Sequence, residues 1–245
     1  MTPGQQGSPL PGLPSAVEAP LSGTLLDYWR HRLRQHLHDT YAGVSLMKFP
    51  EDLRTYEHLL WASRASVVIE IGTLKGGSAL WFRDRLRAMA SYGRVPSYHV
   101  ISIDRELDDA RAGLERTDPS WRETITLIEA DVCDPSLPER VEGLVPPDAD
   151  CMVVEDSAHV YETTTAALEG FARFVRAGGF FVVEDGCVDI DELRLRDSWP
   201  RGVQPAVRDW LGGEVGREFT LRRDLELYGV SCHPCGFLQR GNAHP

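Results

Sequence analysis

Acidic residues follow five successive apolar segments of this 245-residue chain, and they are its strongest candidates for chemistry. Each segment is typical of a buried strand, and open parallel sheets bind ligands outside the carboxyl ends of their strands. One such acid alone is usually a helix cap or a solvated turn residue. Five in succession predict a common ligand site. The acids are Glu70, Asp104, Asp131, the pair Glu155 and Asp156, and the pair Glu184 and Asp185.

A glycine-rich turn follows the first of these segments, in the stretch VVIEIGTLKGGS at positions 67–78. A strand, a tight turn and a helix start form the architecture of a nucleotide-type cofactor site, where glycine lets the backbone approach a ligand closely. The stretch is neither G-x-G-x-x-G nor a P-loop, because Lys75 precedes the second glycine. We expect Ser78 to cap the helix that follows.

The carboxylate of Glu70 indicates the kind of cofactor. It would repel a phosphate, but it suits a positively charged ligand or one with an ammonium group, and S-adenosylmethionine (SAM) carries both. Glu70 would then lie near the methionine end of SAM, with Asp104 at the ribose hydroxyls and Asp131 near the adenine amine. The predicted cofactor residues are Glu70, Gly72, Thr73, Gly76, Ser78, Asp104, Asp131, Val132 and Glu155.

The acids after the fourth and fifth segments predict a metal site. If these two strands are neighbours, their ends lie roughly 5 Å apart, and Asp156, Glu184 and Asp185 can converge on one cation. An all-oxygen set suits Mg²⁺, Mn²⁺ or Ca²⁺, and we expect Mg²⁺. Without a cation the carboxylates would repel one another and raise each other's pKa values. Glu184 and Asp185 can both bind the metal only if the chain turns there, which Gly186 makes easy.

His159 follows Asp156 by three residues, in the segment DSAHVYE. It is either an ordinary loop histidine or a general base. Beside a metal and a bound alcohol the second role is favoured, because the pKa of histidine lies near working pH. His159 and Asp156 are therefore the predicted catalytic residues.

An α/β framework is needed to bring these residues together, and the alternation of strand and helix patterns predicts a parallel, doubly wound sheet. Strands are expected at 67–71, 99–104, 125–131, 151–157 and 180–185, with a closing antiparallel pair at 219–224 and 236–240. Helices are expected at 25–37, 52–62, 79–90, 105–116, 161–176 and 205–212.

Three units follow from this pattern. Positions 1–21 are expected to form a disordered tail rich in Pro and Gly, because they hold too few large apolar groups to pack. Positions 22–64 form an N-terminal helical cap over the mouth of the sheet. Positions 65–245 form the SAM-binding, Rossmann-like domain.

Composition limits the partners. A net charge of −11 argues against binding to nucleic acid or to an anionic membrane. We find no 18-residue apolar run and no secretory signal, and the five scattered cysteines suit reduced thiols in a cytoplasm. Cys232 and Cys235 have the spacing of a redox motif, but they precede a closing strand, which disfavours redox or metal roles.

A short basic segment stands out in this acidic chain. Its arginines form either a solvated face or a clamp for a substrate diphosphate, since guanidinium groups match phosphate oxygens. The candidates for substrate contact are Arg194, Arg196 and Arg201.

In combination, several motifs resemble the cephalosporin hydroxylase/rhamnosyl O-methyltransferase family, from about position 25 to 240. The motifs are Glu70-x-Gly72-Thr73-x-x-Gly76-Gly77-Ser78, Glu155-Asp156-Ser157-x-His159, the run from Gly178-Gly179 to Glu184-Asp185, the turn from Lys48 to Asp52, and the closing segment from Gly236 to Arg240. The resemblance implies a class I SAM-dependent methyltransferase fold, a homo-oligomer, and a divalent cation bound by Asp156, Glu184 and Asp185.

The resemblance further implies methylation of a sugar hydroxyl, on a nucleotide sugar or a glycoside, with a TDP-rhamnose-like deoxysugar of antibiotic biosynthesis as the expected substrate. Two alternatives stay open, because a fold does not fix a function. One is an oxidoreductase or hydroxylase component on the same scaffold, although no two-His-one-carboxylate set is evident. The other is a SAM-binding protein without catalytic activity.

Overall fold

The computed structural model describes residues 23–241, so the predicted disordered tail lies outside the described residues. Its main sheet has seven strands. In chain order they are β3 (Val67–Ile71), β4 (His99–Asp104), β5 (Ile125–Glu129), β6 (Cys151–Glu155), β7 (Phe180–Val183), β8 (Phe219–Leu221) and β9 (Phe237–Arg240). A separate two-stranded sheet pairs β1 (Thr40–Tyr41) with β2 (Val44–Ser45), and the sequence pattern did not indicate it.

The strand order in the main sheet is β5-β4-β3-β6-β7-β9-β8. The strands β3 to β7 are parallel, and β9 runs antiparallel to both β7 and β8, which confirms the closing antiparallel pair. The chain order reverses at β3, which lies between β4 and β6. Such a switch point opens a crevice at the carboxyl ends of the strands, where ligands bind in α/β proteins.

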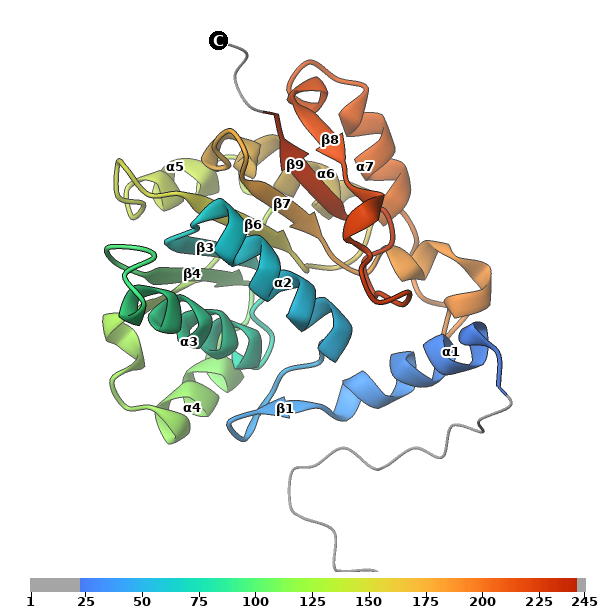
Figure 1. Ribbon diagram of the computed structural model, residues 1–245, viewed down its shortest axis with the longest axis horizontal. Helices are drawn as coiled ribbons and strands as arrows, with labels where there is room; N and C mark the ends of the chain where they lie inside the picture. The colour runs from blue at the N-terminus through green and yellow to red at the C-terminus, as the bar shows by residue number, and fades with distance from the viewer. Residues whose placement is uncertain (1–22, 242–245) are drawn as a thin grey trace, which may run out of the picture.

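Helices cover both faces of this sheet, as Figure 1 shows. One face packs against α2 (Pro50–Ser63), α3 (Gly77–Ser91) and α4 (Asp108–Thr117). The other packs against α5 (Leu137–Glu142), α6 (Tyr161–Phe171) and α7 (Val203–Leu211). All five residues of β3 are buried, as expected for a strand between two helical layers. The doubly wound α/β class is confirmed.

The two helices before the sheet have different places. The first, α1 (Leu25–Gln35), is held at its start by a capping box between Thr24 and Asp27, and its Leu33 reaches the crevice. The second, α2, instead lies against a sheet face through Tyr56, Leu59 and Leu60. The part of the predicted cap that borders the crevice is therefore α1 with the segment after it.

The turn after β3 differs from the prediction at its end. Gly76, at φ 86°, is the N-cap of α3, and Ser78 lies inside the first turn of the helix, so its predicted capping role is wrong. The turn closes when the Gly76 amide donates to the Thr73 carbonyl, and the chain then enters the helix through the left-handed conformation that Gly76 adopts freely. At Gly72 a Cβ would lie 1.9 Å from the Asp156 carbonyl oxygen, so only glycine fits there.

Candidate active site

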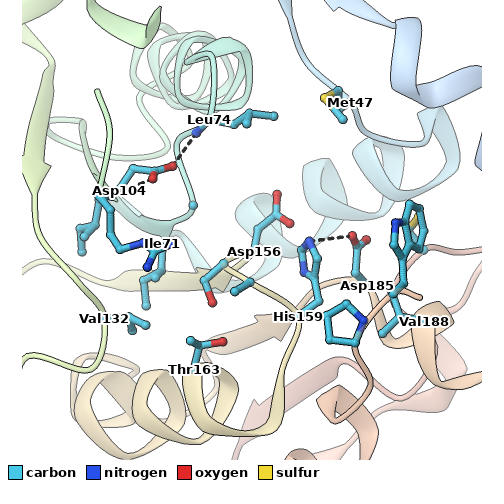
Figure 2. A pocket seen from close by; sticks show the side chains of 18 of the residues that line it. Met47, Ile71, Leu74, Asp104, Val132, Asp156, His159, Thr163, Asp185 and Val188 are labelled. Atoms are coloured by element: carbon cyan, nitrogen blue, oxygen red, sulfur yellow. Dashed lines mark hydrogen bonds and ion pairs between the residues drawn. The ribbon is translucent and has the colours of Figure 1, made fainter. Parts of the chain in front are cut away.

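A cavity of about 560 Å³ opens at the carboxyl ends of the five parallel strands, β3 to β7. Four aspartates lie on its wall, and Figure 2 shows three of them. We call them the crevice acids: Asp104, Asp131, Asp156 and Asp185. The structure therefore brings together predicted residues from four strands.

Three glutamates from the same prediction lie beneath the cavity and not on its wall. We call Glu70, Glu155 and Glu184 the buried acids, since their exposed fractions are 0%, 0% and 2%. Successive side chains along a strand point to opposite faces of the sheet, so these glutamates point into the helical layers and not into the cavity at the strand ends. Glu70 and Glu184 point toward the layer of α2 and α3, while Glu155 meets Thr164 of α6.

The donor half of the cavity lies around β3, β4 and β5, and includes Gly72, Val132 and two crevice acids. Asp104 accepts hydrogen bonds from the Leu74 amide at 2.8 Å and from the Arg105 amide at 2.7 Å. These bonds fix its carboxylate at the rim of the cavity, as Figure 2 shows for Leu74. The close backbone approach at Gly72 and the fixed acids form a donor cradle of the kind that binds nucleotide-type cofactors at the strand ends of α/β sheets.

Glu70 and Thr73 support this half from below. Glu70 accepts from the Ser102 hydroxyl at 2.5 Å, and Thr73 shares a hydrogen bond with Ser102 at 2.7 Å. Burial raises the pKa of Glu70 to about 7, and its Oε1 has no partner within the described residues. Direct contact between Glu70 and the ammonium of SAM stays a prediction, because Glu70 is not among the residues that line the cavity.

The acceptor half holds Asp156, His159 and Asp185, whose ligand atoms lie within 4.8 Å of one another. Nε2 of His159 lies 3.3 Å from Oδ2 of Asp185, and Nδ1 of His159 is buried with no partner in the described chain. Both His159 and Asp185 have a φ of 56°, in the left-handed region that Asp and His adopt more often than most other side chains. The amide of Asp185 donates to Nδ1 of His233, which holds that turn.

Charge in the acceptor half is strongly coupled. Burial raises the pKa of Asp156 to about 7, and the Glu184 carboxylate adds to this effect while Lys48 opposes it. Burial alone would raise the pKa of Asp185, but the facing His159 lowers it below its ordinary value. Burial likewise opposes charge on His159, yet the surrounding carboxylates, with Asp185 first, raise its pKa.

Lys48 is the main residue of the site that sequence reasoning missed. It is 2% exposed, and its Nζ donates to Oδ2 of Asp156 at 2.9 Å and to both oxygens of Glu184 at 2.7 Å. Tyr56 also donates to Glu184, at 2.6 Å. The one indication of Lys48 in the sequence is its rarity, because Lys48 and Lys75 are the only lysines in the chain.

The predicted metal ligands lie in two overlapping groups: Asp156 and Asp185 converge with His159, and Glu184 and Asp185 converge with His233. Asp156 and Asp185 are open to the cavity, whereas Glu184 lies below them and is engaged by Lys48 and Tyr56. The left-handed conformation of Asp185 provides the turn that lets Glu184 and Asp185 approach the same region. The donor set is two open carboxylates with a third behind them, which fits a hard divalent cation. Metal ligation by the three stays a prediction.

The predicted arginine clamp is not on the wall of the cavity. Arg194 donates to the carbonyls of Val188, Asp197 and Trp199, and so supports the wall to which Val188 and Trp199 belong. Arg201 pairs with Asp191. The guanidinium of the exposed Arg196 has no hydrogen-bond or ion-pair partner among residues 23–241, while its backbone carbonyl accepts from the Trp199 amide at 3.1 Å.

The cysteines of the CxxC segment do not pair with each other. All five cysteines are free thiols, and Sγ of Cys232 lies 3.9 Å from Sγ of Cys187. The residue of that segment that contacts the acceptor half is His233. The CxxC spacing did not indicate it, because that pattern concerns only the sulfur atoms. Its ring lies between the Asp185 amide and the carboxylates of Asp52 and Glu184.

A family model described as Rhamnosyl O-methyltransferase/CmcI matches residues 34–241. A rhamnosyl O-methyltransferase of Mycobacterium bovis is 27% identical over 205 residues, which cover 82% of this chain and 78% of that protein. The enzyme of the same description from Mycobacterium leprae is 28% identical over 148 residues, with coverage of 60% and 59%.

Solved structures resemble the fold. A structure of CmcI with Mg and SAM aligns with a TM-score of 0.61 and 23% identity, covering 93% of this chain and 88% of that one. An O-methyltransferase of Bacillus cereus in complex with SAH aligns with a TM-score of 0.51 and 17% identity, with coverage of 70% and 72%. These likenesses establish the class I SAM-dependent methyltransferase fold.

Proposed function

The chain belongs to the Rhamnosyl O-methyltransferase/CmcI family of SAM-dependent O-methyltransferases, and we propose that it methylates a sugar hydroxyl with the help of a divalent cation. The observation that carries this proposal is the acceptor half of the cavity. There Asp156, His159 and Asp185 converge next to the donor cradle at Gly72 and Asp104.

Two groups would be held by the residues described. SAM would lie along Gly72, Asp104, Asp131 and Val132, and it supplies a methyl group made electrophilic by the attached sulfonium. A divalent cation, Mg²⁺ in our proposal, would be held by Asp156, Asp185 and Glu184, and it supplies a Lewis acid that lowers the pKa of the acceptor hydroxyl.

The chain itself moves the proton and fixes the geometry. His159 accepts the hydroxyl proton at Nδ1, the ring nitrogen that has no partner, while Asp185 orients the ring through Nε2. His159 itself lies on the wall of the cavity, in the left-handed backbone conformation. The remaining contribution is positioning, because methyl transfer requires the acceptor oxygen in line with the bond that breaks.

The wall of the acceptor half supports a deoxysugar. Leu33, Met47, Val188 and Trp199 give it an apolar surface, which suits the methyl-bearing face of a 6-deoxyhexose. We propose a nucleotide-activated, TDP-rhamnose-like sugar of natural-product biosynthesis as the substrate. Its diphosphate would extend past Trp199 toward Arg196, whose guanidinium is unpaired within the described part of the chain.

The test is a methylation assay with SAM, Mg²⁺ and two panels of acceptors, nucleotide deoxysugars and neutral rhamnosides. We expect products heavier by one methylene group from the nucleotide sugars, and loss of turnover in EDTA that Mg²⁺ restores. Products from rhamnosides alone would contradict the nucleotide substrate. Full activity in EDTA would contradict the role of the metal.

The hydroxylase alternative considered above would bind its metal through two histidines and one carboxylate. None of the three His/Cys/Asp/Glu clusters found between residues 23 and 241 joins two histidines to a carboxylate, so nothing there favours the hydroxylase alternative. No helix in the same range is long and apolar enough to cross a membrane. Homo-oligomer formation and a cytoplasmic location stay predictions, and light scattering of the purified protein tests the first.

A further inference from the structure

We propose that Lys48 is a built-in counter-cation of the metal centre, which holds Glu184 and Asp156 together and thereby weakens binding of the divalent cation. The inference rests on the metal-dependent function proposed above. It assigns a role to a residue that belongs to neither the methyl donor nor the acceptor contacts.

The contacts of Lys48 use its whole ammonium group. An ammonium has three N–H donors, and Nζ has three acceptors: Oδ2 of Asp156 at 2.9 Å and the two oxygens of Glu184 at 2.7 Å each. The Lys48 side chain is 1% exposed, and that of Glu184 is 3% exposed. The ammonium is therefore a fixed charge within the carboxylate cluster, and not a solvated surface group.

The segment around Lys48 is built to deliver this charge. Met47 has a φ of 53°, a conformation that costs energy for a residue with a side chain, and Figure 2 shows its side chain by the cavity. Phe49 is fully buried and packs edge-on against His36, with ring centroids 5.1 Å apart. The left-handed turn thus places Met47 at the cavity, while Lys48 reaches the carboxylates beneath it.

The balance of charge explains why such a cation lowers metal affinity. Asp156, Glu184 and Asp185 bring three carboxylates to one place, and without a cation they would repel one another. Lys48 relieves part of this repulsion in the absence of metal. A divalent cation that shares Asp156 and Glu184 with Lys48 meets a positive charge across the same carboxylates, and it competes for their oxygens.

A purely structural role for Lys48 predicts something else. If the lysine only stabilised a buried ion pair, its removal would destabilise the fold and leave the intrinsic affinity for metal equal or weaker. The proposed role predicts tighter binding. Metal affinity therefore separates the two roles, whereas stability alone does not.

The experiment measures Mn²⁺ binding by calorimetry and by electron paramagnetic resonance, without SAM or acceptor. We compare the full-length protein with Lys48→Met and with Lys48→Gln, which keeps a hydrogen-bond donor. Lys75→Met is the matched control, because Lys75 is the other lysine and its partner is the exposed Asp109. We expect both Lys48 variants to bind Mn²⁺ roughly tenfold more tightly, and Lys75→Met to bind like the native protein.

Thermal unfolding gives a second readout. Mn²⁺ should raise the Tm of the Lys48 variants more than that of the native protein, because the metal replaces the lost ammonium. Variants that fold only with Mn²⁺ would likewise support the proposal. Variants that fail to fold at any Mn²⁺ concentration would overturn it, because a cation then cannot replace the lysine.

The remaining outcomes separate this inference from the proposed function. Native protein that binds Mn²⁺, with equal or weaker binding by folded Lys48 variants, overturns the inference and leaves the metal-dependent reaction intact. Binding by the variants alone supports the inference and removes the metal from the native reaction. Absence of binding in every protein overturns both.

Discussion

Glu155 and Asp156 are neighbours in the chain, yet one is a buried acid and the other a crevice acid. Glu155 ends β6, so its side chain keeps the register of the strand and meets Ser157 and Thr164 beneath the cavity. Asp156 is the first residue beyond the strand, and its carboxylate reaches the cavity wall. A shift of one residue along a strand end moves a carboxylate from beneath the cavity to its wall.

The buried acids and the crevice acids also differ in residue type. The three buried acids are glutamates and the four crevice acids are aspartates. A short side chain can accept from backbone amides of its own turn, as Asp104 does from Arg105 and Asp131 does from Cys133 at 2.9 Å. The longer glutamate instead reaches across to another element, as Glu184 does to Tyr56. Four predictions test this division.

The largest effect is expected from Asp156→Asn. Loss of one open carboxylate removes a proposed metal ligand, and we expect kcat for methyl transfer to fall roughly a thousandfold. The Tm should stay the same or rise, because the change relieves repulsion from Glu184 and Asp185. Steady-state kinetics and calorimetry on one preparation measure both. A kcat within threefold of the native value would show that Asp156, one of the crevice acids, does not take part in methyl transfer.

His159→Gln should lower kcat by about a hundredfold, the usual contribution of a general base. The left-handed backbone at this position is less common for glutamine than for histidine, so a circular dichroism spectrum must confirm that the variant is folded. The exposed His58 provides a control, and His58→Gln should leave the rate unchanged. Equal rates in the two variants would exclude His159 as the base.

Glu155→Gln tests the other side of the division. The glutamine oxygen can still accept from the Ser157 amide and hydroxyl, but these bonds lose the charge of the carboxylate. The new NH₂ group cannot accept from the Thr164 hydroxyl, so we expect a loss of about 2 kcal/mol in unfolding free energy. A Tm lower by about 5 °C is the corresponding change for a chain of this size. The kcat should stay within about tenfold of native. A native Tm with a collapsed kcat would place Glu155 among the chemical residues.

The smallest effect concerns pH and Glu70. Its pKa in the folded protein is about 7, raised by burial from 4.5, so the folded state holds more protons than the unfolded state between these values. Its contribution to stability is therefore favourable at low pH, falls as pH rises from about 4.5 to 7, and is level above that. Glu70→Gln should flatten this part of a plot of Tm against pH. An unchanged slope would contradict the raised pKa.

Much of this arrangement could be predicted from the sequence, and the limits are physical. Strand ends, glycine turns and acids are local signals, and they located Asp104, Asp131, Asp156 and Asp185. The pattern could not separate crevice acids from buried acids, because the strands end up to two residues before the predicted boundaries. It also could not find Lys48, Tyr56 or His233, which reach the site only through tertiary packing.

The contacts of Glu184 have a consequence for how the protein acquires activity during synthesis. Lys48 is 136 residues away from Glu184 in the chain, and His233, on the far side, lies in the segment before β9. A polypeptide emerging from the ribosome therefore carries most of the donor cradle long before it can complete the acceptor half. The acceptor half is therefore complete only in a chain that extends to the segment before β9.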